Sequence, residues 1–112
     1  MIIKNTTQNT TIATEARIAN NFISRLKGLL GTSCLESGGA LIIRPCSSIH
    51  TLGMKFAIDV IFLDKHDKVV KIINNMKAGR FSLAWGASYV IELPSGIADT
   101  TNIRVGDMIS IL

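Results

Sequence analysis

"IDVIFLD", residues 58–64, and "KVVKII", residues 68–73, are two runs of β-branched and apolar side chains that flank the charged turn "KHD". This pattern predicts an antiparallel hairpin. Both faces of the first run are apolar except at Asp59, which is typical of a strand covered on both sides. We therefore expect this run to lie at the centre of a sheet.

Shorter β-prone runs lie on both sides of this hairpin. Pro45 and Pro94 each close one run, because proline has no N–H with which to continue an interior ladder. The predicted strands are MIIKN (1–5), TTIATEA (10–16), ALIIRP (40–45), SYVIEL (88–93) and the end of RVGDMISIL (104–112). The first two are expected to form a leading hairpin. Residues 94–103 predict a short helix or helical turn, and residues 74–87 are expected to be irregular.

A longer helix is predicted over about residues 15–30. Thr14 is a suitable N-cap for it, and Gly31 favours its end. Apolar side chains recur at intervals of four residues and form one face of this helix, namely Ile18, Phe22, Leu26 and Leu30. The expected fold class is α+β, a predominantly antiparallel sheet that is curled, barrel-like or sandwich-like, with this one main amphipathic helix packed on it.

The composition limits the function classes. Of the 112 residues, 47% are apolar, which suffices for one core, so residues 1–112 are expected to form a single domain. The apolar runs are shorter than the roughly 20 residues of a membrane-spanning helix, and the N-terminus has no signal-peptide pattern. We therefore expect a cytoplasmic protein with no membrane contact. The net charge is +4, but the basic residues are dispersed and aromatic side chains are few, which argues against nucleic-acid binding.

Four segments together resemble one family. They are RLKGLLG (25–31), SIHTLGMKFAIDVIFLD (48–64), YVIELPSG (89–96) and IRVGDMI (103–109). In order and spacing they are similar to domain-of-unknown-function family 192, a group of small bacterial and archaeal proteins, over about residues 12–112. The resemblance implies a compact, predominantly β fold with one main helix, and no particular activity. The larger branch of that family carries a Phe-Trp-Met-Lys-Asn-Thr segment where this chain has residues 49–54, so no ligand preference based on that tryptophan is implied.

Cys46 and His50 are the first candidates for chemistry. An imidazole within hydrogen-bond reach of a thiol can stabilise a thiolate nucleophile, and a carboxylate such as Asp59 could orient the ring. The simpler alternative is a half-buried structural cysteine and a histidine that caps loop carbonyls. Zinc bound by these three residues and Cys34 is a further alternative, but the two cysteines lack the close spacing of structural zinc sites. No metal and no cofactor is predicted.

Two carboxylates interrupt apolar runs, Asp59 in "IDVIF" and Glu92 in "VIELP". Burying a carboxylate is costly unless it is paired or hydrogen-bonded. The structural interpretation of Asp59 is that it accepts hydrogen bonds from backbone N–H groups or from a loop hydroxyl such as Thr51. The functional interpretation is that it forms the polar floor of a pocket. Glu92 could form a partly buried ion pair or line the same cleft.

The leading interpretation is a non-catalytic binding module. Its ligand would be small and polar, with a carbohydrate or a short peptide as the expected class, because polar and aromatic side chains gather in two loops beside buried strands. The predicted ligand-binding residues are His50, Thr51, Met54, Asp59, Arg80 and Trp85. One alternative is a thiol-dependent hydrolase or transferase with Cys46 as nucleophile and His50 as base. Another is a structural or assembly protein, so the sequence leaves open whether the chain is an enzyme.

Overall fold

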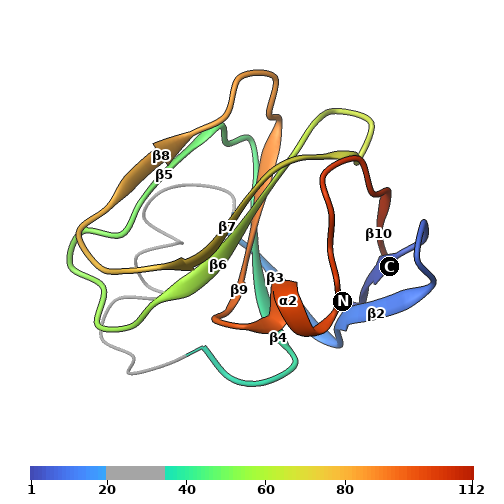
Figure 1. Cartoon of the computed structure of the whole chain (residues 1–112), viewed down its shortest axis with the longest axis horizontal. Helices are drawn as coiled ribbons and strands as arrows, with labels where there is room; N and C mark the ends of the chain where they lie inside the picture. Colours follow the sequence, from blue (N-terminus) through green and yellow to red (C-terminus); the bar gives the residue numbers. More distant parts are fainter. Residues whose placement is uncertain (20–34) are drawn as a thin grey trace.

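The centre of the fold is the hairpin of β6 (Ile58–Leu63) and β7 (Val69–Met76), seen in a computed structural model that describes residues 1–19 and 35–112 (Figure 1). The two strands pair in antiparallel fashion. All six residues of β6 are buried. The predicted hairpin and its strand covered on both sides are therefore confirmed.

β6 is an interior strand of a five-stranded sheet. Across the sheet the strands follow the order β3 (Glu15–Ala19), β4 (Gly39–Ile43), β9 (Tyr89–Pro94), β6 and β7. Neighbouring strands are antiparallel except β3 and β4, which are parallel. The predicted strands ALIIRP and SYVIEL correspond to β4 and β9, and both are confirmed.

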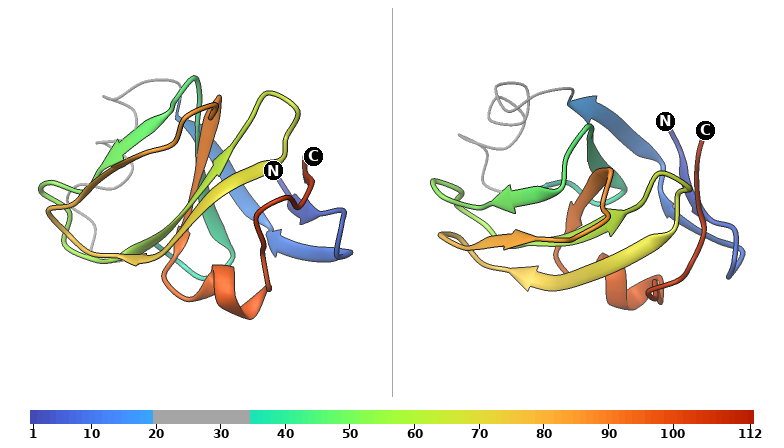
Figure 2. Two further views of the ribbon diagram at one scale, coloured as in Figure 1. Left: turned by 45° about the horizontal axis from the view of Figure 1, so that its top comes forward. Right: turned by 90° about the horizontal axis from the view of Figure 1, so that it is seen from above.

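Two smaller sheets extend the molecule at opposite ends of its long axis (Figures 1 and 2). One has the order β10 (Ile109–Ile111), β1 (Ile3–Asn5) and β2 (Thr10–Ala13), so the predicted leading hairpin and last strand are confirmed. The other is a ribbon of β5 (Ser48–His50) and β8 (Phe81–Leu83). The short predicted helix is α2 (Ile97–Thr100), which directly follows β9.

Side chains of β6 alternate between two cores, one on each face of the five-stranded sheet. Ile61 and Leu63 belong to a core that also contains residues of β1, β10 and α2. Val60 and Phe62 belong to the second core, together with Ile49 of β5. Because both faces are covered, the ends of the strands and their loops are where the sheet remains accessible.

Several expectations about the secondary structure and the sheet need correction. Residues 15–19, predicted as the start of the long helix, form β3, and the rest of that helix, residues 20–30, lies outside the described residues. Thr14 caps no helix there, because the residues that follow it form a strand. Its N–H and that of the next residue donate to the Gly38 carbonyl (3.0 and 2.9 Å). Pairing with β4 along the whole of β3 outweighs the local helical pattern.

The sheet arrangement also differs from the expected barrel. Over residues 1–19 and 35–112 the strands form separate open sheets that are mostly antiparallel, with one parallel pair, and no closed barrel. Residues 74–87, expected to be irregular, contain the end of β7 and all of β8. β5 was not among the predicted strands.

Candidate functional site

Thr51 ties two loops together at one end of the molecule. Its hydroxyl donates to the Lys77 carbonyl (2.6 Å) and accepts from the Arg80 N–H (2.9 Å). Its own N–H donates to the Arg80 carbonyl (2.8 Å), and its carbonyl accepts from Gly79 (3.0 Å) and Met54 (3.2 Å). The side chain is fully buried. Thr51 therefore fixes the turn between β7 and β8 against the loop between β5 and β6.

A cavity of about 440 Å³ lies beside this fixed turn, and we call it the turn cavity. It is lined by Ile73, Asn75, Met76, Lys77, Arg80, Phe81 and Ser82. Ile73 and Met76 belong to the second core, whereas the Phe81 side chain is 65% exposed. The cavity thus combines an apolar wall with a polar and cationic rim.

Two exposed cations stand at the rim of the turn cavity. Among the described residues, no carboxylate forms an ion pair with Lys77 or Arg80, and the side chains of both are exposed. Lys55, also exposed, lies on the loop that Thr51 ties to this turn. The fold therefore brings basic residues that are dispersed in the sequence to one end of the molecule.

Asp59 has a structural environment, as the first of its two interpretations predicted. It is buried, and one carboxylate oxygen accepts from the Asn75 N–H (2.8 Å). The other oxygen accepts from the N–H groups of Gly96 (2.9 Å) and Ala98 (2.8 Å). The partners are backbone groups of β7 and of the start of α2, whereas the hydroxyl of Thr51 bonds elsewhere. The carboxylate thus joins α2 to the β6–β7 hairpin.

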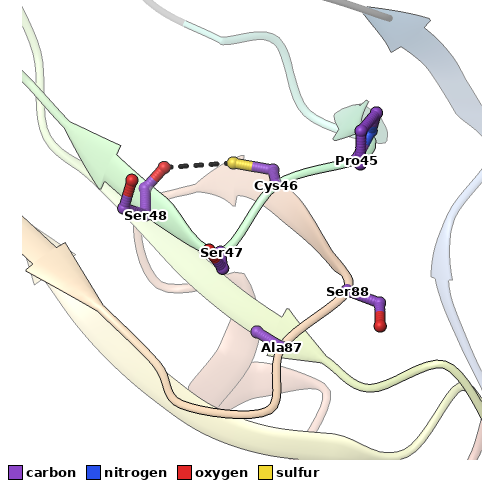
Figure 3. A pocket seen from close by; sticks show the side chains of 6 residues that line it. All are labelled: Pro45, Cys46, Ser47, Ser48, Ala87 and Ser88. Carbon is purple, nitrogen blue, oxygen red and sulfur yellow. Dashed lines mark hydrogen bonds between the residues drawn. The ribbon is translucent and has the colours of Figure 1, made fainter.

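Cys46 lines a different cavity, which we call the cysteine cavity. It measures about 520 Å³ and is lined by Pro45, Cys46, Ser47, Ser48, Ala87 and Ser88 (Figure 3). The Cys46 thiol points along the loop and donates to the Ser48 carbonyl (3.0 Å). A carbonyl acceptor stabilises the S–H form, whereas the nucleophile in thiol chemistry is the thiolate.

The cysteine cavity lies at the other end of β6 from Asp59. The Cys46 N–H donates to the Ser88 carbonyl (3.0 Å), and the Ser88 N–H donates to the carbonyl of Leu63, the last residue of β6 (2.7 Å). Asp59 is four residues earlier in this strand, which corresponds to roughly 13 Å. The structure therefore does not bring Asp59 to Cys46 as the orienting carboxylate of a Cys-His-Asp arrangement.

The residues predicted to share one cleft are distributed over several environments. Arg80 lines the turn cavity, while Thr51 is buried behind it. Met54 is buried in the second core, and His50 is half-buried on β5, opposite Phe81 of β8. Trp85 is 91% exposed on the loop between β8 and β9. Of the predicted set, only Arg80 lines the turn cavity.

Glu92 and Asp59 do not line a common cleft. Glu92 is buried on β9 opposite Val60 of β6, whereas Asp59 pairs with Leu93. Directly paired residues of antiparallel strands point to the same face, and successive residues point to opposite faces. The two carboxylates therefore lie on opposite faces of the five-stranded sheet.

The turn cavity also contains residues that the sequence analysis did not select. Lys77 and Phe81 lie in the segment expected to be irregular, and Asn75 is at its start. One signal was available in the sequence: residues 68–91 contain Lys68, Lys71, Lys77 and Arg80 but no aspartate or glutamate. A basic segment without acidic residues indicates uncompensated positive charge wherever it folds together.

Shifted pKa values occur at the opposite end of the molecule. A hydrogen bond from the Lys68 N–H lowers the pKa of Asp64, which begins the β6–β7 turn. Burial, together with a hydrogen bond to Asp67 (2.7 Å), raises the pKa of Tyr89. Burial acts to raise the pKa of Asp107 as well, but hydrogen bonds led by that from the Asn5 amide (2.7 Å) outweigh it and lower the pKa. These groups hold turns and strands together and lie outside both cavities.

The described part of the chain contains neither a cluster of metal-ligand side chains nor a long apolar helix. Within residues 1–19 and 35–112, no three side chains of histidine, cysteine, aspartate or glutamate gather as metal ligands would. Cys34, one member of the zinc alternative, lies outside these residues. No helix in the same part is both long and apolar enough to cross a membrane.

Comparison with known proteins finds relatives over nearly the whole chain. The model of DUF192, a family described as uncharacterized ACR, matches residues 2–111. UPF0127 protein PF1050 from Pyrococcus furiosus is 37% identical over 107 residues, which cover 92% of this chain and 91% of that protein. A UPF0127 protein from Thermococcus sibiricus is also 37% identical, over 83% of this chain and 63% of that protein, so the chain spans less than two thirds of this second relative.

The fold also matches a solved structure. The crystal structure of a protein of unknown function from Novosphingobium aromaticivorans superposes with a TM-score of 0.82 at 20% sequence identity. The superposition covers 98% of this chain and 82% of the other. At this level of identity the match shows a shared fold.

Proposed function

The chain belongs to the DUF192 family, and we propose that it is a non-catalytic binding module that holds a small polar ligand in the turn cavity. A carbohydrate or a short peptide is the expected ligand class. The observation that carries this proposal is the turn cavity itself, with its apolar wall and its exposed polar rim. Its volume is within the range of small-molecule sites.

The turn that bears the rim is held in place by the protein. Thr51, fully buried, contributes five hydrogen-bonding contacts of 2.6–3.2 Å that involve Lys77, Gly79, Arg80 and Met54. A preorganised rim loses less conformational entropy when a ligand binds. This anchoring supports recognition of a ligand by a fixed set of groups.

The chemistry of the rim supports binding without catalysis. The described residues that line the turn cavity include no cysteine, histidine, aspartate or glutamate. A nucleophile with an adjacent base, or an acid and base pair, is the usual requirement for hydrolysis or group transfer. The thiol-dependent alternative would have to use Cys46, which lies in the cysteine cavity and donates to a carbonyl.

The test is NMR shift mapping with a panel of monosaccharides, disaccharides and tripeptides. We expect at least one class to shift amide resonances of residues 73–82. Phe81→Ala should weaken that binding about fivefold, because partial burial of the ring against a ligand contributes roughly 1 kcal/mol. Trp85→Ala is the matched control, since this aromatic side chain is also exposed but lies outside the cavity, and it should leave the affinity unchanged.

Two outcomes would contradict the proposal. One is a panel that shifts no resonance of residues 73–82. The other is binding that Trp85→Ala weakens and Phe81→Ala does not, because the ligand would then occupy the β8–β9 loop.

A further inference from the structure

The rim of the turn cavity carries positive charge without a counter-ion among the described residues, and from this we infer that its ligands bear a carboxylate or a phosphate. Lys77 and Arg80 recognise this anionic group, and Phe81 contacts the apolar body of the ligand. The inference rests on the proposed function and narrows it to anionic members of the ligand class, such as sugar acids or peptides that present a free carboxylate.

The first step is that both cations are available. Their side chains are exposed, and neither makes a hydrogen bond or an ion pair with another described residue. Only their backbone groups are used, in the bonds to Thr51. Lys71, by contrast, donates to the Ser82 hydroxyl (2.9 Å) and to the Leu83 carbonyl (2.8 Å), so its ammonium group is already bound.

The second step is that the two loops tied by Thr51 carry no acidic residue. The sequence has no aspartate or glutamate between Asp67 and Glu92, and between Glu36 and Asp64 it has only Asp59. Asp59 is buried and accepts three backbone hydrogen bonds. Two cations on one short turn, with Lys55 on the neighbouring loop, therefore create a positive potential that attracts anions.

The third step is the match between these groups and oxyanions. The guanidinium of Arg80 has a planar fork of donors that fits carboxylate and phosphate oxygens, and the ammonium of Lys77 supplies a second charge. Hydrogen bonds between charged partners are stronger than those between neutral ones. Because Thr51 fixes the backbone at Lys77 and at Arg80, the two side chains start from fixed positions on one short turn.

An extended polyanion fits this surface less well than a small ligand. Among the described residues, only three exposed cations lie on the two tied loops, and the aromatic side chain at the cavity is Phe81 alone. Proteins that bind single-stranded nucleic acid use a charged groove with several stacking aromatic residues. Binding of a polyanion alone is therefore an outcome that would count against the inference.

The experiment compares matched probes in NMR titrations of the full chain. Benzoate and phenyl phosphate are the anionic probes, benzamide and benzyl alcohol are their neutral counterparts, and a poly-glutamate chain is the polyanion. We expect the two anions to shift resonances of residues 73–82 and to bind about tenfold more tightly than the neutral probes. A higher salt concentration should weaken the binding of both anions, because salt screens exposed charges. The ranking of the two anions then identifies carboxylate or phosphate as the preferred group.

Variants that remove one charge each show which side chains bind the anion. Arg80→Gln and Lys77→Gln should each weaken anion binding about tenfold, the loss expected for one charge-assisted contact. Lys65→Gln is the matched control, because it removes the same charge from an exposed lysine in the β6–β7 turn at the far end of the hairpin. Dispersed NMR spectra of all three variants verify that they fold.

The outcomes separate the inference from the proposed function. Three results overturn the inference: neutral probes that bind as well as the anions, a control variant that weakens binding as much as Arg80→Gln does, or binding of the polyanion alone. In each case the sugar and peptide panel still tests whether the cavity binds small molecules. If the neutral sugars of that panel shift residues 73–82 and the anions do not, the proposed function stands and the inference fails. If nothing shifts these residues, both fail.

Discussion

Asp59→Ala should be among the most destabilising substitutions in this protein. Its carboxylate accepts hydrogen bonds from the N–H groups of Asn75, Gly96 and Ala98 at 2.8–2.9 Å. Two of these donors belong to the start of α2, whose N-cap residue Gly96 has no side chain to cap the helix. An aspartate on a neighbouring strand therefore performs the capping function that an N-cap serine or aspartate usually performs.

The magnitude follows from the donors that lose their partner. Each buried N–H without an acceptor costs about 1–2 kcal/mol, so alanine at position 59 should lower the free energy of unfolding by about 3–6 kcal/mol. Asp59→Asn keeps one oxygen but turns an N–H₂ group toward a donor and removes the charge, and it should cost about 2–4 kcal/mol. A small domain has about 5–15 kcal/mol in total, so the alanine variant loses a large share.

The assay is urea unfolding followed by far-UV circular dichroism. Fluorescence is less suitable, because the only tryptophan, Trp85, is 91% exposed and changes its environment little on unfolding. Hydrogen exchange should show that the Gly96 and Ala98 amides lose protection in both variants. Asp99→Asn, the same change at an exposed aspartate of α2, should alter stability by less than about 0.5 kcal/mol. An Asp59→Asn variant as stable as this control would refute the capping role.

Three further predictions concern titratable groups. Tyr89 is the only tyrosine, so absorbance near 295 nm reports it directly; burial and the Asp67 hydrogen bond raise its pKa above the ordinary value of 10.0, and stability that is complete below pH 10 should fall as the pH rises further. The pKa of Asp107 lies below 3.8, because hydrogen bonds led by that from Asn5 outweigh burial; stability should be complete above pH 3.8 and fall below it, and Asp107→Asn should remove this acid step in urea titrations. Cys46, whose thiol donates to a carbonyl, should react with iodoacetamide no faster than free cysteine at neutral pH, and a much faster reaction would revive the thiol-dependent alternative.

The strands were predicted well where the sequence carries a two-residue or continuous apolar pattern. β6, β4 and β9 are buried on both faces, and their apolar runs are bounded by turns or prolines. The prediction was wrong for residues 15–19, where a helical spacing of apolar residues is also compatible with strand pairing. Parallel pairing of β3 with β4 joins segments distant in the chain, and nothing in the local pattern of either segment specifies such a partner.

The candidate site was predicted less completely, for a physical reason. Asp59 was selected because a carboxylate in an apolar run needs a partner, and Thr51 was named as a loop hydroxyl that could supply one. Both are buried and hydrogen-bonded. Their partners, however, are backbone groups. Every residue except proline carries the same backbone N–H and C=O groups. The type of residue therefore cannot show which of these groups will bond to a given carboxylate or hydroxyl. The link from Thr51 to residues 77–80 was therefore invisible, and with it the position of the turn cavity.

The hydrogen bonds of Thr51 also determine where the positive charges lie in the fold. In the sequence, Lys55, Lys77 and Arg80 are separated and suggest only a soluble surface. Once Thr51 joins their loops, the same residues form a positive end, while Asp64, Asp67 and Asp107 lie at the other end of the β6–β7 hairpin. Positive charges that are dispersed along the sequence thus come together at one end of the fold. If the turn cavity binds anions, we expect these local charges to attract them, rather than the net charge of the protein. Lys65→Gln and Arg80→Gln each remove one positive charge, so a loss of binding in Arg80→Gln alone shows that the position of the charge matters.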